Sequence, residues 1–173
     1  MKDDPGSERA IVPGKETIRM LRRAATWRFK DAEILRLGGR SHGAVYLYGY
    51  CVEMIVKSAC YALDDRDPFS PITEAVRDDV ARRNAAELGV DKPRNHQLVK
   101  WSRLLAEMVL KHRTDRELSR EIVVQAQVVE NRWTADMRYR PSRLSPGEVE
   151  AVGAAALWFR RVLSRYPNKI GGD

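Results

Sequence analysis

The chain has 173 residues, of which 43% are hydrophobic and 32% are charged, with a formal net charge of +7. This length and composition fit one globular domain, and no apolar run approaches the roughly 18 residues that would indicate a membrane span. The basic excess, which is mostly arginine, favours a nucleic-acid or phosphate-bearing partner.

The ends of the chain differ in composition from its middle. We expect a flexible N-terminal arm over residues 1–14, a helical domain over 15–166 and a flexible tail over 167–173. The amino-terminal sequence is polar and acidic, unlike a secretory signal. Cys51 and Cys60 lie too far apart on one predicted helix to form a disulfide. These features favour a cytoplasmic protein.

The first predicted helix runs from Lys15 to the stop signal Gly38–Gly39. Its apolar residues recur at the spacing of one buried face. They are Ile18, Leu21, Ala25, Phe29, Ala32 and Leu35. Because the next helix follows after so short a connection, we expect the two helices to be antiparallel neighbours.

The second predicted helix, from Gly39 to Leu63, is apolar on nearly all sides. Such a helix is buried against several neighbours, so we expect it at the centre of a bundle. Glu53 and Lys57 interrupt it at the spacing of a helical ion pair. Buried charges need a partner. The pair therefore either fixes helix packing or lines a cleft.

The rest of the chain contains four more helical patterns. A charged, weakly periodic one over 72–88 is expected to be peripheral, with Ser70 as its N-cap and Pro71 as its first residue. Asn95 is the expected cap of a helix over 97–111, whose inner face is formed by Leu98, Trp101, Leu105 and Met108.

Two capping boxes are predicted after that. Thr114 and Glu117 suit the start of a helix over 115–131, and Ser145 with Glu148 suits the start of the last helix. No strand-like alternation is present. The sequence therefore predicts an all-α, single-domain helical bundle of five to six helices.

An arginine-rich segment between the last two predicted helices is the most distinctive candidate site. It contains Arg132, Trp133, Arg138, Tyr139 and Arg140. Arginines can clamp phosphates and aromatic rings can stack on bases, which predicts nucleic-acid or nucleotide binding. In the alternative interpretation, Trp133 and Tyr139 fill the core and the arginines are solvated.

Other kinds of site find little support. His42, His96 and His112 lie on three different segments without the paired spacing of metal ligands, so no metal is expected. The chain has no glycine-rich phosphate loop and no local nucleophile motif. We therefore expect no cofactor.

Three groups of residues form a pattern in a fixed order. The first is Asp31-Ala32-Glu33 followed by Gly39 and Arg40. The second runs from Gly43 to Glu53 and is followed by Lys57. The third combines Asn95-His96-x-Leu98 with the later Trp133 and Arg138-Tyr139. Together they span roughly Thr26 to Tyr139, and they resemble the HEPN family, small all-α domains of prokaryotic toxin–antitoxin and defence systems.

The resemblance implies a bundle of about five helices that forms homodimers through the face bearing its functional groups. It also implies RNA or a nucleotide as ligand, sometimes with a nucleotidyltransferase as partner protein. Ribonuclease members use an arginine followed a few residues later by a histidine, without metal.

The chain departs from that ribonuclease pattern. No histidine follows Arg132 or Arg138 at the family's distance, so the sequence resembles a non-nuclease variant. Arg36 and His42 match the spacing, but across the turn before the central helix. The leading hypothesis is an RNA- or nucleotide-binding protein.

Two alternatives remain open. One is a metal-independent endoribonuclease, in which His42 or His96 is brought to the arginines from another helix or protomer. The other is a dimeric interaction module whose basic face meets an acidic partner protein.

Overall fold

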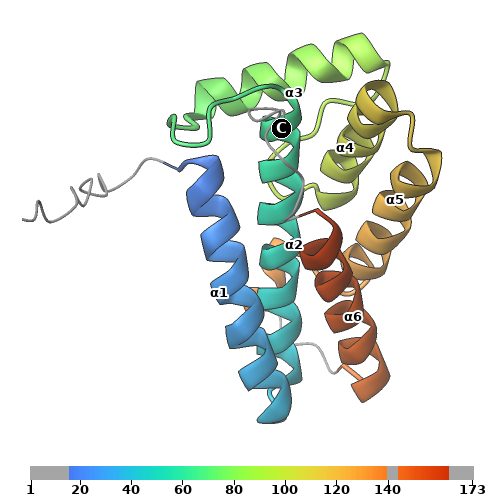
Figure 1. The fold of residues 1–173 in the computed structure, drawn as a ribbon. Helices are drawn as coiled ribbons and strands as arrows, with labels where there is room; N and C mark the ends of the chain where they lie inside the picture. The colour runs from blue at the N-terminus through green and yellow to red at the C-terminus, as the bar shows by residue number, and fades with distance from the viewer. Residues whose placement is uncertain (1–15, 140–143, 164–173) are drawn as a thin grey trace, which may run out of the picture.

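A computed structural model describes residues 16–139 and 144–163 of the chain. Its described part contains six α-helices and one short 3₁₀ helix, η1, and no strand. In chain order these are α1 (Ile18–Leu37), α2 (Ser41–Leu63), α3 (Glu74–Leu88), α4 (Leu98–Arg113), α5 (Arg116–Glu130), η1 (Ala135–Tyr139) and α6 (Pro146–Val162). The predicted all-α, single-domain bundle is confirmed (Figure 1).

Helix α2 is the centre of the bundle. Sixteen of its 23 residues are buried, so it has neighbours on nearly every side, as its sequence predicts. Helix α1 packs along it in the antiparallel direction, and α6 packs on α2 beside α1 (Figure 1). The turn between α1 and α2 contains Gly39 at φ 69°, a conformation that favours glycine and ends α1 as predicted.

Helices α4 and α5 pack against α2 as well, and α3 packs against α4. The predicted inner face of α4 is buried, and Ile122, Ala126 and Val129 form the buried stripe of α5. Helix α3 lies across the end of the bundle where α2 finishes and buries few residues, which matches its weak periodicity (Figure 1). Among the described helices, none combines the length and apolar character needed to cross a membrane.

Three predicted N-caps are wrong. Helix α3 begins at Glu74 with Thr73 as N-cap, not at Ser70 and Pro71. Ile72 is buried, and its N–H donates to the Glu16 carbonyl at 2.6 Å, so residues 70–72 are held beside the start of α1 and lie outside any helix. Tertiary contacts therefore shift the start of α3 beyond Ser70, the first residue suited to cap it.

The other two wrong caps flank α4. Asn95 does not cap this helix, because its side chain accepts a hydrogen bond from Arg77 at 3.1 Å. Thr114 ends α4 in the left-handed conformation, φ 54°, and Asp115 caps α5 instead. The Ser145–Glu148 capping box of α6 is confirmed.

The predictions for the two ends of the chain concern residues that lie outside the described part. The expected arm over 1–14 and the tail over 167–173 therefore stay predictions. The start of the helical pattern falls at Ile18 rather than Lys15, with the Thr17 hydroxyl accepting from the Met20 N–H at 3.1 Å.

Candidate functional site

One face of α2 carries most of the polar and aromatic candidates. His42, Tyr46, Tyr50 and Glu53 are spaced by four, four and three residues, so they share a face of the helix. The first three are partly exposed, whereas Glu53 is buried. We call this row the His42–Glu53 face.

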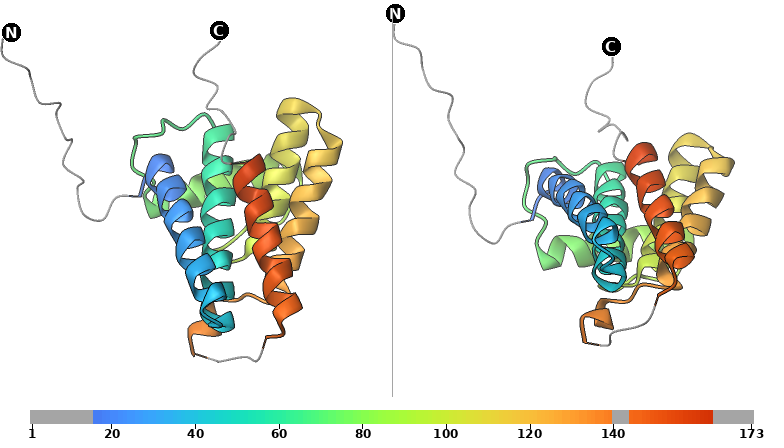
Figure 2. Two further views of the ribbon diagram at one scale, coloured as in Figure 1. Left: turned by 60° about the horizontal axis from the view of Figure 1, so that its bottom comes forward. Right: turned by 90° about the horizontal axis from the view of Figure 1, so that it is seen from below.

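His42 fastens η1 to the start of α2. Its Nε2 lies 2.8 Å from the Met137 carbonyl oxygen, and because a carbonyl can only accept, Nε2 carries the proton and donates. Figure 2 shows η1 at the end of the bundle where α1 finishes and α2 begins. The backbone of the arginine-rich segment at Arg138 and Tyr139 is thereby held beside the His42–Glu53 face.

Trp133 lies in the core beneath this face. It is 1% exposed, and its Nε1–H donates to the Tyr46 carbonyl at 3.1 Å. Its ring lies against Gly49 and meets the edge of the Tyr50 ring at 5.4 Å between centroids. Trp133 was predicted either to fill the core or to stack on a base. At this buried position it can only pack in the core, since neither ring face is open to a base.

His96 meets the same face further along α2. Its Nδ1 lies 2.9 Å from Glu53 Oε2, and the side chain is 46% exposed whereas that of Glu53 is 5% exposed. Because a carboxylate accepts, Nδ1 carries the proton, and Nε2 is left to accept one. The Tyr50 ring packs edge-on against the imidazole at 5.9 Å.

The backbone of His96 is unusual. Its φ is 57°, in the left-handed region that a residue with a side chain seldom adopts. Strain of this kind costs about 1–3 kcal/mol and is retained where surrounding contacts impose it. Here the Glu53 contact, made from the loop before α4, is such a constraint.

Glu53 and Lys57 form the predicted ion pair, and it is buried. Lys57 donates to Glu53 Oε1, so the two carboxylate oxygens serve Lys57 and His96 respectively. The Lys57 ammonium also lies 5.6 Å from the centre of the Trp101 ring. The pair therefore both packs α2 against α4 and orients the exposed imidazole.

Arg36 belongs to a different cluster. It donates to Glu33 at 3.0 Å, and Tyr48 donates to the other oxygen of the same carboxylate. The Arg36 hydrogen bond holds the pKa of Glu33 below its usual value, and burial raises the pKa of Tyr48. His42 instead contacts the Met137 carbonyl, so the two residues have different partners.

The arginine-rich segment is described in part. Arg132 is exposed and forms an ion pair with Glu148, the capping-box residue of α6. For Arg138 and Tyr139 the structure gives the backbone, in η1. Arg140 lies outside the described residues.

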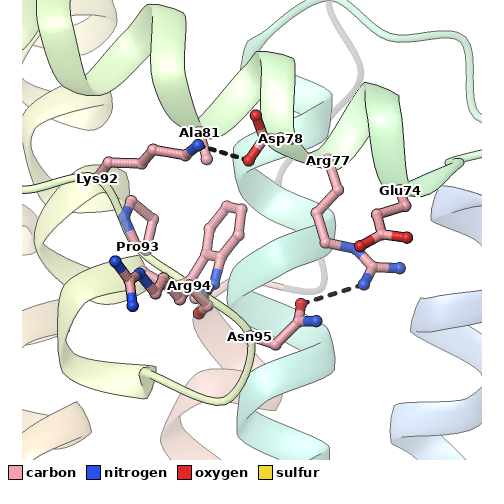
Figure 3. A pocket seen from close by; sticks show the side chains of 9 residues that line it. Glu74, Arg77, Asp78, Ala81, Lys92, Pro93, Arg94 and Asn95 are labelled. Carbon is pink, nitrogen blue, oxygen red and sulfur yellow. Dashed lines mark hydrogen bonds and ion pairs between the residues drawn. The ribbon is translucent and has the colours of Figure 1, made fainter.

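A pocket of about 410 Å³ opens between α3 and the loop that leads to His96. Figure 3 shows Lys92 reaching Asp78 and Arg77 reaching Asn95 across it. These groups are paired with one another, so the pocket is a polar groove whose charges are largely satisfied. Its floor includes Trp101, whose Nε1–H donates to the Arg94 carbonyl at 3.0 Å.

Tyr46 and Tyr50 lie on this face but are not among the residues predicted for a site. Both are partly exposed, and their rings meet edge-on at 4.9 Å between centroids. Their spacing from His42 and Glu53 on one predicted helix is the sequence signal that could have revealed this shared face. Read together, the four positions mark a single polar and aromatic face.

The fold and the site define a class: an all-α bundle whose central helix exposes a row of histidine and tyrosine side chains. Comparison of the chain with family models, curated proteins and solved structures gave no match.

Proposed function

We propose that the protein is HEPN-like and binds single-stranded RNA or a nucleotide along the His42–Glu53 face. One observation carries this proposal. The partly exposed Tyr50 ring packs against Tyr46 and His96, and also against Trp133 in the segment that contains Arg132 and Arg138.

The rings suit the bases of such a ligand. Stacking of a base on an aromatic side chain contributes about 1–3 kcal/mol and tolerates different bases. Tyr46 and Tyr50 meet edge to face rather than stacked on each other, and both are partly exposed to solvent. Trp133 packs against the Tyr50 ring and donates to the Tyr46 carbonyl.

The arginines suit the phosphates. Guanidinium groups bind phosphate oxygens bidentately, and Arg132, Arg138 and Arg140 lie within nine residues of one another in the sequence. The resemblance to HEPN domains adds the expectation of a toxin–antitoxin or defence system, with a homodimer and a nucleotidyltransferase-type partner.

The test is the salt dependence of RNA affinity. For the unmodified protein, the affinity for a short single-stranded RNA should fall steeply between about 50 and 200 mM salt, because each neutralised phosphate releases counterions. The double variant Arg132→Gln/Arg138→Gln should bind at least tenfold more weakly, and its log–log salt slope should be shallower by about 0.7 per lost contact. Fluorescence anisotropy of labelled RNA measures both quantities.

A matched control removes the same charge elsewhere. Arg116→Gln/Arg120→Gln takes two exposed arginines from α5 and should leave the slope nearly unchanged. A salt-independent affinity, or equal losses in the two double variants, would contradict the proposal. In that event a protein-interaction module becomes the better description.

The geometry of His96 favours a second candidate function, metal-independent RNA cleavage. Glu53 fixes Nδ1 as the protonated nitrogen, and Nε2 has no partner among the described residues, so it can accept a proton from a ribose 2′-hydroxyl. An adjacent arginine would stabilise the charge that develops on the phosphate. Tyr50, which touches both His96 and Trp133, links this imidazole to the arginine-rich segment.

If this second function is present, cleavage of labelled RNA should continue in EDTA, and His96→Ala should lower its rate by about 100-fold or more. His112→Ala, remote in sequence and on α4, is the control and should cleave normally. Intact RNA after prolonged incubation with the unmodified protein would rule the function out and leave binding.

A further inference from the structure

Helix α1 exposes a row of large apolar side chains on its outer face. Trp27 is 55% exposed, Ile34 69% and Leu37 76%, and Met20 completes the row. These four are most of the exposed large hydrophobic side chains among the described residues. Helix α1 lies at the edge of the bundle, with its inner face on α2 (Figure 1).

The spacing of these apolar residues indicates that a partner covering them would be a helix. Met20, Trp27 and Ile34 are seven residues apart, and Leu37 follows three residues later. A seven-residue repeat keeps an apolar seam facing a second helix that runs along the first. A lone exposed hydrophobic residue needs no explanation, but several large ones aligned along one helix mark an interaction surface.

The charges beside the row are basic. Arg23 and Lys30 lie between the apolar residues, and neither has a carboxylate partner in the described part of the chain. Lys30 lies over the Trp27 ring at 5.6 Å. The nearby carboxylate of Asp31 is bound to Arg28 at 3.5 Å. The surface offered to a partner helix is therefore apolar with a positive border.

A second copy of this chain is a poor occupant. A parallel pair of α1 helices would place Arg23 beside Arg23 and Lys30 beside Lys30, and an antiparallel pair centred on Trp27 would place Arg23 beside Lys30. Like charges in such positions oppose association.

We propose that the outer face of α1 binds an amphipathic helix of another protein, with apolar residues at heptad spacing and acidic residues at its borders. The acidic borders would pair with Arg23 and Lys30, and the apolar seam would cover Trp27 and Ile34. This surface is separate from the His42–Glu53 face, so the proposal does not depend on RNA binding.

Two synthetic helical peptides test the proposal with the full chain. Both carry leucine at heptad seam positions; one has glutamate at the bordering positions and the other has lysine. The glutamate peptide should bind at least tenfold more tightly, as measured by calorimetry, and Trp27→Lys or Ile34→Lys should abolish that binding. Val124→Lys, at an exposed apolar residue of α5, is the control and should leave it intact.

Reversal of the border charges gives the sharpest result. The variant Arg23→Glu/Lys30→Glu should prefer the lysine peptide, and its circular dichroism should match that of the unmodified protein because both residues are exposed. Equal binding of the two peptides, or no binding up to about 1 mM, would overturn the proposal. A concentration-dependent dimer that Trp27→Lys abolishes would overturn it too, in favour of a second copy.

Discussion

Replacing Gly49 with alanine should destabilise the protein by about 3 kcal/mol or more, a large effect for the addition of one methyl group. A Cβ atom at this position would lie closer than 3.0 Å to the ring of Trp133. That ring is fully buried and held by its hydrogen bond to the Tyr46 carbonyl, so it cannot move aside without opening the core. Elsewhere in a helix, alanine would be favoured over glycine by about 1 kcal/mol. The steric cost therefore exceeds the propensity gain.

Chemical denaturation checks this result. The midpoint should fall without a change in slope, and thermal melting should shift down by about 6–12 °C for a chain of this size. Gly147→Ala is the matched control, since a Cβ there would meet no atom within 4 Å. In a Trp133→Ala background the added cost of Gly49→Ala should largely vanish. A neutral Gly49→Ala would show that Trp133 does not occupy this position in solution.

Local sequence patterns predicted the helices well but predicted several of their starts poorly. The stripes of α4 and α5 repeat at a period that only a helix can use, so their buried faces followed directly from the sequence. The start of α3 is decided by Ile72, whose burial and backbone bond to Glu16 come from packing beside the start of α1. Ser70 is an acceptable cap by chemistry, yet Thr73 is used because of that contact.

The candidate site shows the same division between local and distant information. The pairing of Glu53 with Lys57 is a contact within one helix turn, and the sequence predicted it. The contact of His96 with Glu53 joins residues 43 positions apart and requires a left-handed backbone at His96. No local pattern indicates such a conformation at a histidine. For the same reason, the fit of Trp133 on Gly49 could not be read from either position alone.

Replacing Glu53 with leucine should be the second most damaging single change, with a cost of about 3–5 kcal/mol. Lys57 is 9% exposed, so its ammonium would be left buried with only the Trp101 ring beside it. Lys57→Met should cost less, because Glu53 keeps its contact with His96. The double variant Glu53→Leu/Lys57→Met should be more stable than Glu53→Leu alone, since it buries no unpaired ammonium.

A double-mutant cycle from urea denaturation measures this coupling. The exposed pair Lys111–Glu87 provides the comparison, and its coupling energy should be small because solvent screens both charges. The buried pair should couple by more than twice that amount. Equal coupling in the two cycles would mean that water reaches Lys57 in solution. In that case Glu53 would be no more than a surface partner of His96, and the oriented imidazole would lose its rigid support.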